Sequence, residues 1–251
     1  MPLPESILII NPNSSSSMTA ALEPLLADLK HPNLELTYYT APSTSPASIN
    51  DAETSALSAS EALPDLLRYL KTSNRENSRK PRFSAYLIAC YSNHPLTYTL
   101  REKVDAPVLN IFHASILQAR LLARPFGIVT TGSYWVPVFE KATPEFLMGG
   151  HTKNGEVASR IEDFVGVRST GLTAVELHST PQEEVHRRVS EATADLVGNG
   201  AEVILMGCAG MSGMEEAVRA GARSRGKEVS VVDGVRAGVV LLEGLVRAQK
   251  L

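Results

Sequence analysis

Val203-Ile-Leu-Met-Gly-Cys208 is a short apolar run, and small and polar residues follow it directly in Ala209-Gly-Met-Ser-Gly213. A buried strand of a parallel sheet has this pattern, and open α/β sheets bind their ligands just beyond the carboxyl ends of such strands. The other cysteine repeats the pattern: Cys90 closes Ala85-Tyr-Leu-Ile-Ala-Cys90 and precedes Tyr91-Ser-Asn-His-Pro95. We therefore expect both thiols at a ligand-binding edge of a sheet.

An earlier strand end precedes each cysteine at nearly the same distance. Cys90 follows Asn11, the residue after Ser6-Ile-Leu-Ile-Ile10, by 79 positions. Cys208 follows Thr130, the residue after Phe126-Gly-Ile-Val129, by 78 positions. This spacing is too long for a solenoid repeat and suits duplicated lobes. We expect the two cysteines at equivalent positions of the two lobes, facing one another.

Strand and helix patterns alternate along the chain. A helix is expected from Met18 to Lys30, and another from Asp51 to Leu70 with an interruption at Pro64. This alternation predicts an α/β protein with parallel sheets in two lobes. We assign residues 1–108 and 228–251 to the first lobe, closed by the C-terminal strand and helix, and residues 109–227 to the second.

Composition excludes several classes of function. The chain has 251 residues, 43% hydrophobic and 20% charged, which suffices for a large core. A net charge of −3 offers no basic surface to nucleic acid, and the one cationic cluster, Lys71 to Arg82, has the composition of a surface loop. We find no apolar stretch of the roughly 18 residues that a membrane span needs, and no secretion-signal pattern. We expect a cytosolic protein without nucleic-acid or membrane partners.

Two thiols suit one kind of chemistry. In a reducing compartment they are expected to be free, and no spacing of the two cysteines and six histidines fits a zinc site, so no metal is expected. Taken singly, each cysteine is better explained as a small buried apolar residue than as a catalytic group. As a pair, a thiolate can remove a proton from one face of a carbon while a thiol returns one to the other face. This inverts a stereocentre without a cofactor.

Such a site has two requirements. One thiol must lose its proton below the usual pKa of about 8.5, and the enolate that forms must be stabilised by hydrogen-bond donors. Each cysteine precedes an expected helix start, so the amides of residues 91–94 and 209–212 are expected to face the substrate. Glycines beside the second thiol allow close backbone approach: Gly207, Gly210 and Gly213.

Four motifs together resemble the hydantoin and allantoin racemase branch of the aspartate/glutamate racemase superfamily. They are Ile9-Ile-Asn-Pro-Asn-Ser-Ser, Ile88-Ala-Cys-Tyr-Ser, Gly127-Ile-Val-Thr-Thr-Gly and Leu205-Met-Gly-Cys-Ala-Gly-Met. The resemblance covers nearly the whole chain and includes both cysteines. It implies two flavodoxin-like lobes with a substrate cleft between them, and cofactor-independent racemisation of 5-substituted hydantoins by two thiols.

The resemblance also implies roles for single residues. Cys90 and Cys208 match the two catalytic bases, and Asn13 matches a substrate-binding position. Thr130 and Thr131 match the loop that contacts the substrate ring. Further substrate contacts are expected beside the thiols, from Tyr91, Ser92, Asn93, Ala209 and Gly210. Asn13 is otherwise explained as a turn and helix cap, and the threonines as β-branched strand residues.

Two histidines mark departures from the family pattern. His94 follows Cys90 in a stretch where bacterial hydantoin racemases have an Asp-Pro pair, and His113 stands where the family usually has Glu. As a cation His94 would favour the thiolate of Cys90; alternatively, it ends a loop before a Pro-started helix. Both histidines are candidate modulators of the site.

The most specific hypothesis is a homo-oligomeric isomerase that acts on a small hydantoin-type molecule, with allantoin as a natural candidate. No Arg or Lys adjoins the four motif loops, which argues against an amino-dicarboxylate substrate. The alternatives are an isomerase or decarboxylase of the same superfamily that acts on a small carboxylic acid, and a non-catalytic ureide-binding protein. Trp135 and Phe139 are expected to pack rather than to bind substrate.

Overall fold

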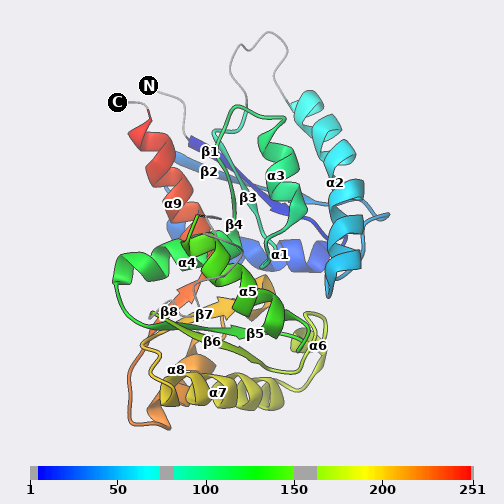
Figure 1. Cartoon of the computed structure of the whole chain (residues 1–251). Helices are drawn as coiled ribbons and strands as arrows, with labels where there is room; N and C mark the ends of the chain where they lie inside the picture. The colour runs from blue at the N-terminus through cyan, green and yellow to red at the C-terminus, as the bar shows by residue number, and fades with distance from the viewer. Residues whose placement is uncertain (1–4, 74–81, 150–162, 250–251) are drawn as a thin grey trace, which may run out of the picture. The chain divides into compact units, whose positions relative to one another are not determined.

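A computed structural model describes residues 5–73, 82–149 and 163–249 (Figure 1). The chain forms two compact units, one of Met1–Ala114 with Val235–Leu251 and the other of Ser115–Gly234. Each unit has its own parallel sheet with helices around it, which confirms the α/β class. Among the described residues, no helix combines the length and apolar character that crossing a membrane requires.

The first unit contains a parallel sheet of strand order β2-β1-β3-β4. Its strands are β1 (Glu5–Asn11), β2 (Leu34–Thr40), β3 (Ala85–Ile88) and β4 (Val108–Asn110). Its helical segments are α1 (Ser16–Leu25), the 3-10 turn η1 (Ala27–Leu29), α2 (Ala52–Ser73), α3 (Pro95–Arg101) and, from Val235 onward, α9 (Gly234–Ala248).

Side-chain alternation along the strands explains the core of the first unit. Ile10 and Ile88 point to one face of the sheet, where they pack with Leu66 of α2 and other buried residues. Leu87 points to the opposite face, where α9 passes so closely that a Cβ on Gly238 would lie 2.4 Å from Leu87 Cδ1. Because both faces are covered, the strands are continuous apolar runs.

The second unit contains a parallel sheet of strand order β6-β5-β7-β8. Its strands are β5 (Phe126–Thr130), β6 (Phe164–Ser169), β7 (Val203–Gly207) and β8 (Ser230–Asp233). Its helical segments are α5 (Trp135–Leu147), α6 (Glu176–Ser179), α7 (Gln182–Gly198), the 3-10 turn η3 (Ala209–Met211) and α8 (Glu215–Arg223). Helix α4 (Ile111–Leu122) starts in the first unit and belongs to the second from Ser115.

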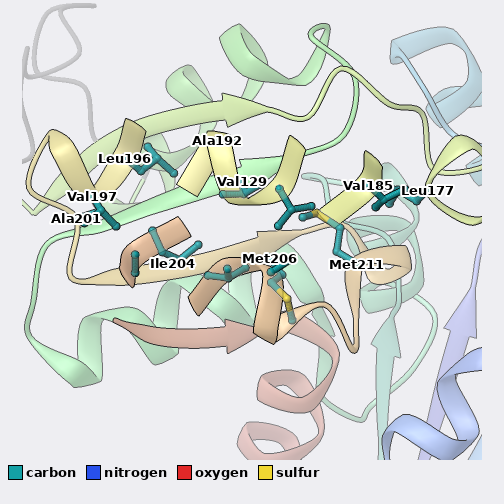
Figure 2. Packing of buried hydrophobic residues seen from close by; sticks show 14 of the residues in the cluster. Val129, Leu177, Val185, Ala192, Leu196, Val197, Ala201, Ile204, Met206 and Met211 are labelled. Carbon is teal, nitrogen blue, oxygen red and sulfur yellow. The ribbon is translucent and has the colours of Figure 1, made fainter. Parts of the chain in front are cut away.

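An apolar cluster joins one face of the second sheet to α6, α7, α8 and η3 (Figure 2). Val129 of β5 and Met206 of β7 contribute from the sheet, and Leu196 contributes from α7. The contact between α7 and β5 is so close that a Cβ on Gly127 would lie 2.8 Å from Leu196 Cδ2. Figure 1 shows α7 and α8 on one side of this sheet and α5 on the other.

The two units repeat one strand order, as the spacing of the cysteines predicted. In each sheet the first strand of the unit pairs with the third, so β1 pairs with β3 and β5 pairs with β7. The fourth strand of each unit then passes into a helix without a loop, at Asn110 in one unit and at Asp233 in the other. Corresponding positions of the two sheets therefore come from corresponding parts of the chain.

The C-terminal strand corrects the expected organisation. We expected residues 228–251 to close the first lobe, but β8 pairs with β7 in the second sheet, with Met206 opposite Asp233. Helix α9 does belong to the first unit from Val235. An apolar edge strand such as Val231-Val232 carries no sign of the sheet that it joins, so its pairing depends on the tertiary fold.

Smaller expectations have mixed outcomes. Helix α2 continues through Pro64, because Pro64 and Ser60 are both exposed and water can replace the lost hydrogen bond of the Ser60 carbonyl. The expected loop from Lys71 to Arg82 is helical up to Ser73, and residues 74–81 lie outside the described part of the chain. Trp135 and Phe139 are buried and stack with ring centroids 5.3 Å apart, as expected for packing.

Candidate active site

The carboxyl ends of the central strands carry the expected site residues in both units. In the first unit Ile10 lies opposite Ile88, and Cys90 follows two residues later. In the second unit Thr130 lies opposite Gly207, and Cys208 is the next residue. We call residues 11–13, 90–94 and 110–113 the Cys90 cluster, and residues 130–131, 207–212 and 233 the Cys208 cluster.

Cys90 lies in a tight turn after β3. The thiol forms no disulfide and is partly buried, and its Sγ lies 3.5 Å from Ser92 Oγ. The Ser92 N–H donates to the Cys90 carbonyl at 3.0 Å, which closes the turn. Tyr91 and Ser92 are buried, whereas Asn93 is exposed and accepts a hydrogen bond from the Tyr98 hydroxyl at 2.5 Å.

The Asn13 side chain is bonded within its own loop. Its Oδ1 accepts from the Ser15 N–H and from Asn11 Nδ2, both at 2.9 Å. Asn11 is the more buried of the two, and its Nδ2 also donates to Thr19 Oγ1 at 3.0 Å. Asn13 thus forms the turn that one of the two sequence interpretations described, and its contact with substrate stays a prediction.

His94 is a neutral helix cap. It is fully buried and lies at the N-cap of α3, where Nδ1 accepts the Leu96 N–H at 3.2 Å. Because Nδ1 accepts, the proton of the neutral ring lies on Nε2, which has no hydrogen-bond partner among the described residues. Burial lowers the pKa of His94 to about 4, so the ring is uncharged at pH 7. Of the two interpretations of His94, a nearby cation or a loop end before a Pro-started helix, the structure supports the second.

His113 is neutral for the same reason. Asn110, the last residue of β4, accepts the His113 N–H through Oδ1 at 2.7 Å and donates from Nδ2 to the ring Nδ1 at 3.2 Å. The same Nδ2 donates to Thr97 Oγ1 at 3.2 Å. Burial, assisted by the charge of Arg101, lowers the pKa of His113 to about 4.

Cys208 lies at the start of η3, directly after β7. Its Sγ accepts the Gly210 N–H at 3.3 Å. The thiol is free and partly buried, and burial raises its pKa to about 11, while the N–H groups of Gly210 and Met211 act in the opposite direction. Desolvation exceeds hydrogen bonding here, so the resting residue is a thiol at pH 7.

The helical segments that directly follow the two cysteines are short. Helix α3 has seven residues and begins at Pro95, and η3 has three residues, so neither provides the dipole of a long helix. Several of the expected donor amides are also used within the loops. Met211 donates to the Cys208 carbonyl at 3.0 Å, and Ser212 donates to the Ala209 carbonyl at 3.3 Å.

Thr130 and Gly207 hold the ends of β5 and β7 together. Thr130 is fully buried, and its Oγ1 donates to the Gly207 carbonyl at 3.3 Å. A Cβ on Gly207 would lie 2.6 Å from the Val129 carbonyl oxygen, so the position requires glycine. Thr131 is also buried, and its carbonyl accepts from the Ser169 hydroxyl.

Sequence reasoning did not name three polar strand-end residues as candidate site residues. Asn11 ends β1, Asn110 ends β4, and Asp233 ends β8, where it accepts a hydrogen bond from the Ser212 hydroxyl. Each is the first polar residue after an apolar run, which is the signal that could have identified it.

Comparison with known proteins identifies the family of this two-unit fold. The profile described as Asp/Glu/Hydantoin racemase matches residues 7–242. A hydantoin racemase of Rhizobium meliloti is 30% identical over 96% of this chain and 89% of its own, and an uncharacterised protein of Schizosaccharomyces pombe is 36% identical over 96% and 92%. The crystal structure of an allantoin racemase from Pseudomonas fluorescens matches with a TM-score of 0.76 and 26% identity, over 97% of this chain and 92% of that chain.

On the basis of these similarities the protein is a racemase, an enzyme of the isomerase class. The chain belongs to the Asp/Glu/hydantoin racemase family.

Proposed function

We propose that the protein is a cofactor-independent racemase that inverts C5 of a hydantoin-type ureide, either a hydantoin or allantoin. Cys90 and Cys208 are its two acid/base groups. The observation that carries the proposal is that each thiol follows the third strand of its unit, in two sheets of the same strand order. The hydantoin racemase and allantoin racemase among its relatives support this substrate class.

The chemistry of the ring suits two thiols. The C5 proton of a hydantoin lies beside a carbonyl, so its removal spreads negative charge onto oxygen. One cysteine as thiolate takes this proton, and the other as thiol donates a proton to the opposite face. For the other enantiomer the two cysteines exchange roles. A turnover in one direction followed by a turnover in the other returns both cysteines to their starting protonation states.

The electrostatics of the Cys90 cluster fit an uncharged ring. Burial keeps His94 and His113 neutral at pH 7, and the motif loops contain no Arg or Lys. A substrate with two carboxylates would be expected to need fixed cations. The amide group of Asn13 and the hydroxyl group of Ser92 instead suit the imide and urea edges of a ureide.

The test is loss of optical rotation from pure enantiomers of allantoin and of a 5-alkylhydantoin. We expect the natural chain to racemise at least one of them, and Cys90→Ser and Cys208→Ser each to lower the rate by about 10²-fold or more, the usual contribution of a general acid or base. The double variant and buffer alone give the spontaneous rate, and circular dichroism checks that the variants are folded.

Other outcomes separate the remaining hypotheses. Natural rates in either single variant would contradict the two-thiol mechanism. Tight binding of a ureide without loss of rotation would indicate a ureide-binding protein. Release of carbon dioxide from a substituted malonate, with only one cysteine required, would indicate a decarboxylase.

A further inference from the structure

An exposed histidine that sequence reasoning did not consider lies beside the Cys208 cluster. A Cβ placed on Gly210 would lie 3.2 Å from His178 Nε2 and 3.6 Å from Cys208 Sγ. The imidazole and the thiol therefore border the same small space, the one left open by the missing side chain of Gly210. All three residues belong to the second unit.

The short helix α6 holds His178 in this place. Leu177, the preceding residue, is 4% exposed and belongs to the apolar cluster that includes Met211 of η3 (Figure 2). Its Cδ1 lies 3.5 Å from the same Cβ position on Gly210. The start of α6 is tied by Glu176, whose Oε2 accepts the Thr173 N–H at 2.8 Å and the Thr173 hydroxyl at 2.9 Å. The imidazole is thus carried by an anchored turn.

Cys208 needs a proton acceptor to act as a base. Burial raises the pKa of its thiol to about 11, and the Gly210 N–H offsets this only in part. A racemase that works in both directions requires each cysteine to be a thiolate for one enantiomer. An adjacent imidazole is the usual partner that converts a buried thiol into a thiolate.

We propose that His178 is the proton partner of Cys208, acting across the space beside Gly210. The S–H bond of Cys208 breaks and an N–H bond forms at Nε2 of His178, which leaves a thiolate and an imidazolium. The reverse transfer restores the thiol. His178 is a positioning residue, because it acts through the sulfur. The role of the thiolate in turnover rests on the proposed function, whereas the proton exchange between Cys208 and His178 can be tested without turnover.

The charged groups near α6 have hydrogen-bond or ion-pair partners other than His178 and Cys208. Helix α6 packs against α7 and η3. On α6 the pKa of Glu176 is lowered by its hydrogen bonds from Thr173, and on α7 Arg188 pairs with Glu184 at 2.7 Å. Beyond η3, Asp233 accepts from the Ser212 hydroxyl. The cation of Arg188 is thus balanced by Glu184.

The test is the rate at which iodoacetamide alkylates each cysteine between about pH 6 and 9, measured by mass spectrometry of digests. Because the thiolate is the reactive form, this rate reports the thiolate content of each cysteine. We expect His178→Ala and His178→Gln to slow alkylation of Cys208 about tenfold at pH 7, as a pKa rise of one unit would. Cys90 in the same chain is the internal control. His186→Ala is the matched control, because it also removes a histidine from the second unit but at a different place. His186 of α7 lines a surface hollow with Ala217 and Ala220 of α8.

A second variant tests the geometry. Gly210→Ala keeps both side chains but places a methyl group 3.2 Å from His178 Nε2, so Cys208 should again react slowly. Unchanged Cys208 reactivity in the His178 variants, or an equal fall at Cys90, would overturn the proposal. If Cys208 responds as expected while no ureide is racemised, the ion pair stands and the proposed function fails. In an active enzyme, the pH profile of kcat should shift to higher pH in His178→Gln.

Discussion

Cys90 and Cys208 occupy equivalent positions but have different surroundings. The sulfur of Cys90 lies 3.5 Å from a serine hydroxyl, whereas that of Cys208 accepts a backbone N–H at 3.3 Å and borders the same space as an imidazole. A two-base racemase needs one thiol and one thiolate at any moment. In the proposed mechanism, these different surroundings would control the proton of each sulfur separately.

Burial of His94 leads to a prediction about acid stability. The unfolded chain protonates this histidine near its ordinary pKa of 6.5, but the folded chain does so only near pH 4. The stability that neutral His94 contributes is therefore present above pH 6.5 and is lost as the pH falls toward 4. Asparagine at position 94 would still accept the Leu96 N–H as an N-cap, but it does not titrate.

We expect His94→Asn to remove up to about 1.4 kcal/mol per pH unit from the acid dependence of the unfolding free energy. Urea unfolding at several pH values between 7 and 4.5, roughly the interval of the shift, measures this slope. The absolute stability will fall because the smaller side chain leaves space, so the slope carries the test. The same slope in both proteins would contradict a buried, neutral His94.

Some site residues could be predicted from the sequence and others could not. The positions of Cys90 and Cys208 after strands were predicted, because a strand end is visible as an apolar run that stops. The charge of His94 was not, since it depends on how α3 buries the ring. The proximity of His178 to Cys208 was not either, because it arises where α6 and η3 pack and leaves no local pattern.

At the scale of elements, glycine sets the approach of α8 to α7. A Cβ on Gly221 of α8 would lie 2.3 Å from the Ser190 carbonyl oxygen of α7, a backbone atom that cannot turn aside. We expect Gly221→Ala to destabilise the protein by about 1–3 kcal/mol through overpacking. Thermal and urea unfolding measure the loss.

Gly244→Ala is the matched control for this prediction. Gly244 also lies inside a helix, α9, but a Cβ there would have no atom within 4 Å outside its own helix. The higher helix propensity of alanine should stabilise this variant by about 0.5–1 kcal/mol. Destabilisation of similar size in both variants would show that close packing at Gly221 is not the cause.

Element boundaries followed local patterns better than element partners did. The apolar runs that end before Asn11, Cys90, Thr130 and Cys208 all form strands, and the helix expected from Asp51 to Leu70 runs from Ala52 to Ser73, because apolar periodicity is a local feature. The helix expected from Met18 to Lys30 is shorter and runs from Ser16 to Leu25. Pro64 was expected to interrupt α2, but its effect depends on which face of the helix it occupies. The partner of β8 was wrong because an apolar edge strand does not encode its neighbour.

At the scale of the whole molecule, the chain builds two sheets of one order and ends with a helix that belongs to the first unit. The fourth strand of each unit leads directly into a helix, α4 or α9. Such repetition gives a physical reason for two thiols at equivalent strand ends. The proposed function builds on this repetition: its central claim is that both thiols serve one substrate carbon.

The most direct measurement of this claim is deuterium labelling of the two enantiomers during early turnover in D₂O. A single enantiomer of the ureide is incubated with the protein. Substrate and product are then separated on a chiral column, and the deuterium content of each is measured by mass spectrometry. With two thiols, the product enantiomer should carry deuterium at C5 from the first turnovers. The remaining substrate should exchange its C5 hydrogen no faster than it does spontaneously in buffer. Product that retains the original hydrogen, or equal labelling of both enantiomers, would indicate a single base and contradict the account.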